Sequence, residues 1–96
     1  MIIESYHAYI YDAGTVDEAQ PHLIHEGEYD IHCELEWVYG EPQVNIIDVL
    51  EDGRSLYSSS DVWVKQLATR VADVAENDDW VIDQVVQDYA DNREAA

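Results

Sequence analysis

The sequence predicts an α+β domain in which a three- to four-stranded antiparallel sheet is followed by two C-terminal helices packed on one face. Residues 29–39 alternate apolar with polar side chains over eleven positions, which is the two-residue period of a strand with one buried face. Between residues 61 and 92, apolar residues recur every three or four positions, as they do on helices. Strands that precede helices in this way are typical of α+β domains.

Two further strands are expected beside the central one. Residues 2–11 are rich in β-branched and aromatic types, and their apolar side chains divide between both sides, which fits a strand covered on both faces. After a loop at residues 40–42, residues 44–51 should return antiparallel to the central strand. The core positions expected in this returning strand are Val44, Ile46 and Leu50.

Turn residues place the remaining connections. Asp52-Gly53 supplies positive φ at both centres of a tight hairpin turn, and a short fourth strand over residues 54–57 should follow it. Before the central strand, one short helical turn is expected between Thr15 and Pro21, because a capping-box spacing opens that stretch and proline ends it.

Two helices are expected in the C-terminal third. Ser and Asp side chains accept hydrogen bonds from the free N–H groups of a helix start. The three serines at residues 58–60 and the following Asp61 therefore predict a first helix over residues 61–76. Residues 77–79 should end it and cap a second helix that reaches about Asn92. Residues 1–96 are therefore expected to form a single domain around one modest core.

The charge of the chain is its most unusual property. There are 22 Asp and Glu residues against four Lys and Arg, and the formal net charge is −18. Such a chain repels nucleic acid and anionic membranes, so we expect neither direct DNA or RNA binding nor membrane association. An acidic surface also improves solubility, as in halophile proteins, and charge alone does not separate that role from a charge-driven binding role.

The sequence also suggests a cytosolic protein. It has no apolar run of the ~18–20 residues that span a bilayer, and its first residues lack a positive segment followed by an apolar one. Cys33 is the single cysteine. We expect it to be a buried thiol in a reducing compartment, without a disulfide or a redox role.

No motif for catalysis or cofactor binding stands out. His22, His25, His32 and Cys33 form the most metal-like group, but neighbours on a strand face opposite sides, so His32 and Cys33 should not reach one ion. The serines are explained as cap and turn residues, and the glycines do not form a phosphate-binding loop. We therefore expect no enzyme, no metal site and no cofactor. A small hydrolase with a carboxylate pair is a further alternative.

Tryptophan and tyrosine are the aromatic types that anchor protein interfaces. Trp63 lies off the apolar row of the first helix, so it is either an exposed anchor or a side chain folded over the sheet edge, and the second reading is favoured. Trp37 and Trp80 are expected in the core.

The acidic residues form the candidate partner-binding surface. Carboxylates four or five residues apart on a helix are separated by ~6–7.5 Å along its axis, close to the interval between phosphates on an extended nucleic-acid strand. A solvated helix face is the plainer reading. The acids also extend to the outward face of the central strand, at Asp30, Glu34 and Glu36, and this spread favours a nucleic-acid mimic. The expected binding residues are Glu34, Glu36, Trp63, Asp73, Glu76, Asp78, Asp79, Asp83, Asp88 and Asp91, with Glu94 extending the helical series.

A resemblance supports the same reading. The run EWVYGEPQVNIIDVLEDGRSL, followed by a short acidic helical tail, is similar to small orphan proteins of bacteriophages. The balance of size and charge resembles phage-encoded DNA mimics, including several anti-CRISPR proteins and restriction inhibitors. The resemblance implies a stoichiometric inhibitor in the cytoplasm of a bacterial host.

Two functions are therefore carried forward from the sequence. The first is a non-enzymatic inhibitor that binds the basic nucleic-acid site of a host defence complex or DNA-handling protein. The alternative is an acidic adaptor or assembly module that uses an aromatic sheet surface and forms a homodimer through an exposed strand edge.

Overall fold

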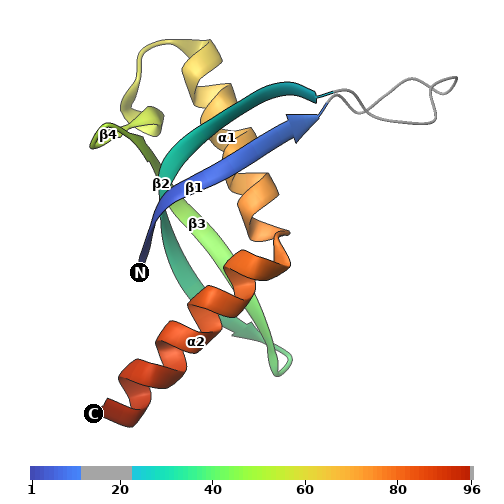
Figure 1. Cartoon of the computed structure of the whole chain (residues 1–96), viewed down its shortest axis with the longest axis vertical. Coiled ribbons are helices and arrows are strands. Elements are labelled where there is room, and N and C mark those ends of the chain that lie inside the picture. Colours follow the sequence, from blue (N-terminus) through green and yellow to red (C-terminus); the bar gives the residue numbers. More distant parts are fainter. Residues whose placement is uncertain (12–22, 96) are drawn as a thin grey trace, which may run out of the picture.

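The computed structural model describes residues 1–11 and 23–95, with side chains up to Asn92. It contains a four-stranded antiparallel sheet in the order β1-β2-β3-β4, followed by two helices, and so confirms the predicted α+β fold. Figure 1 shows α1 beside the part of the sheet where β1 pairs with β2, and α2 beside the far part of β2 and β3. The elements are β1 (Ile2–Tyr11), β2 (Leu23–Val38), β3 (Glu41–Glu51), β4 (Arg54–Ser55), the 3₁₀-helix η1 (Leu56–Ser58), α1 (Val62–Glu76) and α2 (Asp79–Ala95).

Most element boundaries match the sequence-based expectation. Strand β1 occupies the expected residues, whereas β2 begins six residues earlier than expected, at Leu23. The fourth strand is only two residues long because the chain turns into η1 at Leu56. The helical turn expected between Thr15 and Pro21 lies outside the described residues.

Strand β1 is buried on one face only, which corrects the expectation that both faces are covered. A bulge lies between Ile3 and Tyr6, where Ser5 has a φ of 54° and its N–H donates to the Asp30 carboxylate at 3.0 Å. The additional residue moves Ile3 to the buried face and leaves Ile2 exposed. From Tyr6 onward, every second residue of β1 is buried up to Ile10.

A second bulge corrects the core face of β3. His32 pairs with Asp48 and Cys33 pairs with Ile46, so Ile47 is an additional residue on β3. Because one inserted residue reverses the facing of all that follow, Val49 is fully buried and Leu50 is not. Val44 and Ile46 precede the bulge and are buried as expected.

The β2–β3 and β3–β4 hairpins close through two-residue turns with positive φ. Asp52 and Gly53 have φ of 53° and 78°, which confirms the predicted turn. The other turn is Tyr39-Gly40, with φ of 52° and 80°, rather than a loop over residues 40–42. Strand β3 consequently begins at Glu41.

The core lies between one face of the sheet and the two helices. Asp61 caps α1 by accepting from the Trp63 N–H at 2.9 Å, and Asp78 accepts from the Trp80 N–H at 3.0 Å at the start of α2. Within the described part of the chain, neither helix is long and apolar enough to cross a membrane. The buried residues are Ile3, Tyr6, Ala8, Ile10, Tyr29, Ile31, Cys33, Val44, Ile46, Val49, Ala68, Val71, Ala72, Ala75, Val81 and Val85.

Two tryptophans expected in the core are on its border instead. Trp37 is 48% exposed and Trp80 is 52% exposed. Trp37 lies next to the hairpin turn, beyond the buried part of β2, and meets Tyr89 edge-on with ring centroids 6.0 Å apart. Trp80 is in the first turn of α2 and stacks on Tyr6 at 6.4 Å.

Candidate acidic interface

The charges of the described side chains are unevenly distributed. Residues 28–53 and 71–92 contain fifteen Asp and Glu residues and no Lys or Arg. These stretches form most of the β2–β3 hairpin, the C-terminal end of α1 and nearly all of α2. The described cationic side chains, Arg54, Lys65 and Arg70, are on β4 and the earlier turns of α1. The charged side chains of the hairpin and α2 are therefore mostly acidic, although α2 also includes Arg93 and the Met1 ammonium donates to the Cys33 carbonyl of β2.

Helix α2 contributes the acids that are most available to a partner. Asp79, Asp83 and Asp91 are exposed, and Asp88 is half-buried. The Gln87 amide donates to Asp91 at 2.9 Å, and the Asn92 amide donates to Asp88 at 3.2 Å. These contacts follow the four-residue spacing of a helix face and orient two carboxylates near the end of α2.

The outward face of β2 contributes a second acidic row. Glu34 and Glu36 are exposed on the side opposite the core, as expected from the alternation. Glu36 accepts a hydrogen bond from the Asn45 side chain of β3 at 3.1 Å. Asp30 is on the same face but accepts from the bulge amide of Ser5, so its carboxylate also stabilises β1.

Two of the expected binding residues form structural contacts. Glu76 at the end of α1 accepts from the backbone N–H of Ile46 at 2.9 Å, which joins the helix to β3. Asp78 accepts from the Tyr6 hydroxyl at 2.8 Å. Burial, followed by this hydrogen bond and the Asp78 charge, raises the pKa of Tyr6 above its usual range. Asp73, on α1, is exposed.

Trp63 is 80% exposed, so the reading in which it folds over the sheet edge is wrong. It lies in the first turn of α1 and borders a small pocket of about 160 Å³ with Ile24 and Arg70. Glu76 ends α1 about 20 Å farther along the helix axis, at 1.5 Å per residue, and Asp79 begins α2 after it. The structure therefore does not bring Trp63 together with the acids of α2.

Aromatic side chains that the sequence did not assign to the interface border the acidic residues. Trp37 and Tyr89 meet between β2 and α2, and Tyr39 is fully exposed at the hairpin turn. A groove of about 400 Å³ lies next to them, between β2 and α2. Gly40 between two alternating segments was the sequence signal for this turn, because its position needs positive φ, and it would have placed Trp37 and Tyr39 at the exposed end of a hairpin.

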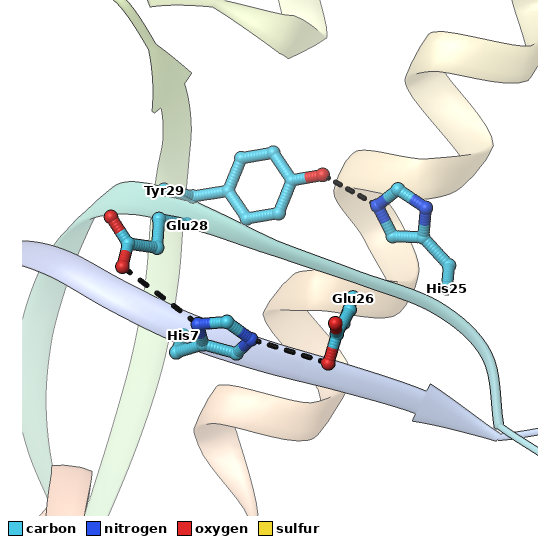
Figure 2. Close-up of polar contacts among 5 residues, drawn as sticks. All are labelled: His7, His25, Glu26, Glu28 and Tyr29. Atoms are coloured by element: carbon cyan, nitrogen blue, oxygen red, sulfur yellow. Dashed lines mark hydrogen bonds and ion pairs between the residues drawn. The ribbon is translucent and has the colours of Figure 1, made fainter.

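His7 and His25 lie on opposite faces of the sheet, as Figure 2 shows. On the outward face, the His7 ring lies 3.6 Å from Glu26 and 3.8 Å from Glu28. On the helix side, His25 Nε2 is 2.7 Å from the Tyr29 hydroxyl. The two groups do not converge on one site.

The candidate zinc ligands that the structure describes are not brought together. Cys33 is buried on the core face and His32 is half-buried on the other, as the strand period requires. Burial raises the pKa of the Cys33 thiol to about 11, which keeps it protonated and weakly reactive near neutral pH. His22 is outside the described residues, and within the described part no three His, Cys, Asp or Glu side chains are grouped to hold a metal ion.

Comparisons of the chain with protein-family models, with curated proteins and with solved structures find no match.

Proposed function

We propose that this protein is a non-enzymatic inhibitor that imitates nucleic acid and occupies a basic nucleic-acid site in a bacterial host, such as that of a defence complex. The observation that carries the proposal is the separation of charge. Long stretches without Lys or Arg lie on the β2–β3 hairpin and on α2 up to Asn92, and the described Lys and Arg side chains lie elsewhere. A basic channel attracts such a surface as it attracts a phosphate backbone.

The binding residues under this proposal are the exposed acids of α2 and of outward β2. Asp79, Asp83 and Asp91 project from α2, and Glu34 and Glu36 from β2. Glu76 and Asp78 contribute to the local negative charge, but their carboxylates are already hydrogen-bonded within the fold. Trp63 would be a second and separate contact point.

Exposed aromatics favour one other function, an adaptor whose aromatic surface mediates assembly. Trp37, Trp63 and Trp80 are all about half exposed or more, and such side chains are enriched at interfaces. Salt separates the two functions, because an acid-driven association weakens steeply as salt rises, whereas an aromatic one changes little.

The test is affinity capture with the immobilised protein from a bacterial lysate at low salt. Bound proteins are eluted with a salt gradient, identified by mass spectrometry, and assayed for loss of a labelled DNA duplex when the protein is added. We expect nucleic-acid-binding proteins that release DNA in proportion to the inhibitor added. Captured proteins that bind no nucleic acid, or that keep their DNA, would contradict the proposal.

A matched pair of variants locates the surface. Asp79→Lys with Asp83→Lys reverses two exposed acids of α2, and Glu4→Lys with Glu26→Lys makes the same change in net charge at two exposed acids outside the stretches 28–53 and 71–92. We expect the first variant to lose DNA release and the second to retain most of it. Equal loss in both would mean that only total charge matters.

A further inference from the structure

Strand β2 extends beyond the strand that covers its edge. Strand β1 pairs with β2 as far as Ile2 opposite His32, and Met1 makes the final backbone contacts with Cys33, at 2.7 and 3.2 Å. From there β2 continues to Val38 paired with β3 alone, as Figure 1 shows for the far part of the hairpin.

The backbone groups of Leu35 and Trp37 point away from β3. Successive residues of a strand direct their N–H and C=O groups to alternate sides, and Cys33 directs its groups to Met1. Leu35 and Trp37 therefore have the same orientation as Cys33, and no described residue forms a hydrogen bond with their backbone groups. We call these two positions the open β2 edge.

The opposite edge of the hairpin is blocked at two positions, which lie on either side of Val44. On β3, the outward N–H of Ile46 donates to the Glu76 carboxylate at 2.9 Å, and Pro42 has no N–H to offer. A capping side chain and a proline are the usual means of preventing an edge from pairing with another strand. Along the described chain, the open β2 edge has neither.

A groove beside the open β2 edge is lined by apolar and acidic side chains, with Met1 and its N-terminal ammonium at the Cys33 end. It has a volume of about 400 Å³, and Leu35, Val85 and Tyr89 supply its apolar lining. Glu34 and Asp88 supply carboxylates. The aromatic pair of Trp37 and Tyr89 continues the apolar surface toward the turn.

We propose that the open β2 edge binds an extended basic segment of a partner protein as an additional strand. Side chains of an added strand alternate between the faces of the sheet. On the helix side they meet Leu35 and Tyr89, and on the outward side they meet Glu34 and Glu36. The fitting segment therefore alternates apolar side chains with Lys or Arg. This deepens the proposed function, and it rests on that function for the basic character of the partner.

A second copy of the chain fits this edge poorly. Antiparallel pairing of two β2 strands about Leu35 places Glu34 of one copy opposite Glu36 of the other, twice. Like charges directly opposite each other destabilise a strand pair. Both copies also bring a net charge of −18, whereas a basic segment is complementary to the same surface.

The test uses a labelled synthetic peptide of alternating Lys and Val as the probe, with binding followed by fluorescence polarisation and amide hydrogen exchange. We expect the peptide to bind and to slow exchange of the Leu35 and Trp37 amides in the wild-type protein. The same peptide with N-methyl groups along one backbone edge keeps its charge but cannot pair as a strand, and it should bind more weakly. Binding that leaves both amides unprotected would overturn the proposal.

A pair of variants isolates the backbone contribution. Trp37→Pro removes an outward N–H without removing a bond to β3, and Trp37→Val removes the same aromatic ring but keeps the N–H. We expect Trp37→Pro to bind the peptide roughly fivefold to tenfold more weakly than Trp37→Val, the effect of about one hydrogen bond. Equal binding by the two variants would count against the open β2 edge. The wild-type exchange measurement decides the matter if Trp37→Pro fails to fold.

The outcomes separate this inference from the proposed function. If Asp79→Lys with Asp83→Lys abolishes DNA release while Trp37→Pro and Trp37→Val inhibit equally, the mimic stands and the strand-addition inference falls. If sedimentation shows a dimer that Trp37→Pro alone dissociates, the edge is occupied by a second copy and the inference is likewise wrong. Peptide binding at the edge without any DNA release contradicts the mimic and leaves the edge site intact.

Discussion

Tyr6 links the sheet to the start of α2 through a single hydroxyl. Its ring is buried and stacks on Trp80, and its hydroxyl donates to the Asp78 carboxylate. Asp78 also caps α2 by accepting from the Trp80 N–H. One carboxylate therefore fixes both the start of α2 and its contact with β1, which is why Asp78 is a poor candidate for a free binding group.

Alkaline pH should weaken the fold through Tyr6. Its pKa is raised in the folded state from 10.0 in the unfolded chain, so its contribution to stability is complete below pH 10 and is lost as pH rises above it. Tyr6→Phe should lower the free energy of unfolding by about 1–2 kcal/mol at neutral pH, where a hydrogen bond to a carboxylate is lost. Above pH 10, the free energy of unfolding should also fall less steeply with pH in Tyr6→Phe than in the wild type. Urea unfolding at several pH values measures both effects.

Tyr9→Phe provides the matched control for this prediction. Tyr9 is exposed on the outward face of β1, close to His7, and it lacks the buried contact of Tyr6. We expect the free energy of unfolding of Tyr9→Phe to decline with pH as it does in the wild type. A Tyr6→Phe protein with an unchanged slope would show that Tyr6 does not drive the alkaline loss. Tyr29 and Tyr57, whose pKa values are also raised by burial, should still cause some decline.

At the scale of elements, the turn between β2 and β3 contains a residue that is poorly suited to its conformation. Tyr39 has a φ of 52° and a fully exposed side chain. Type I′ turns favour Asn-Gly because both central residues need positive φ. An exposed tyrosine in that position costs stability and gains no packing.

Tyr39→Asn should therefore stabilise the protein by about 0.5–1 kcal/mol in urea unfolding, because asparagine adopts positive φ at lower cost. Asp52→Asn is the control, since Asp52 holds the equivalent position in the Asp52-Gly53 turn and already suits it. We expect Asp52→Asn to change the free energy of unfolding little. A destabilised Tyr39→Asn protein would mean that the tyrosine ring supports the hairpin.

The positions of the strands could be predicted from the sequence, but their bulges could not. Alternation identified β2 and placed Tyr29, Ile31 and Cys33 in the core, where they are buried. A bulge adds one residue without any change in composition, and it reverses the facing of all later residues. This is why Val49 is buried in the core and Leu50, which was expected there, is not.

The candidate surface was only partly predictable for a similar reason. Asp79 and Asp83 are exposed as helical spacing suggests. Glu76 and Asp78 are in the same acidic series, yet one joins β3 and the other joins Tyr6. Those contacts depend on how α1 and α2 approach the sheet, and the periodicity of a single helix contains no such information. The open β2 edge likewise depends on where β1 pairing ends.

For the molecule as a whole, the arrangement of charge opposes the fold that displays it. The stretches 28–53 and 71–92 meet where α2 packs on β2 and β3, and they contain no Lys or Arg. Described ion pairs are limited to the contacts of His7 with two glutamates. Repulsion between the hairpin and α2 is therefore screened by solvent ions rather than offset by internal partners.

Added sodium chloride should consequently raise the thermal midpoint of the free protein, with most of the gain between low and physiological ionic strength as the Debye length falls to about 8 Å. Asp79→Asn with Asp83→Asn removes two exposed charges of α2 and should be more stable at low salt and respond less to salt. Scanning calorimetry across a salt series measures both proteins. Sucrose, which favours the compact state without screening charge, should stabilise the two equally. A wild-type thermal midpoint that does not depend on salt would show that repulsion between α2 and the hairpin is energetically unimportant. In that case the wild type and the double variant should also have the same midpoint at low salt.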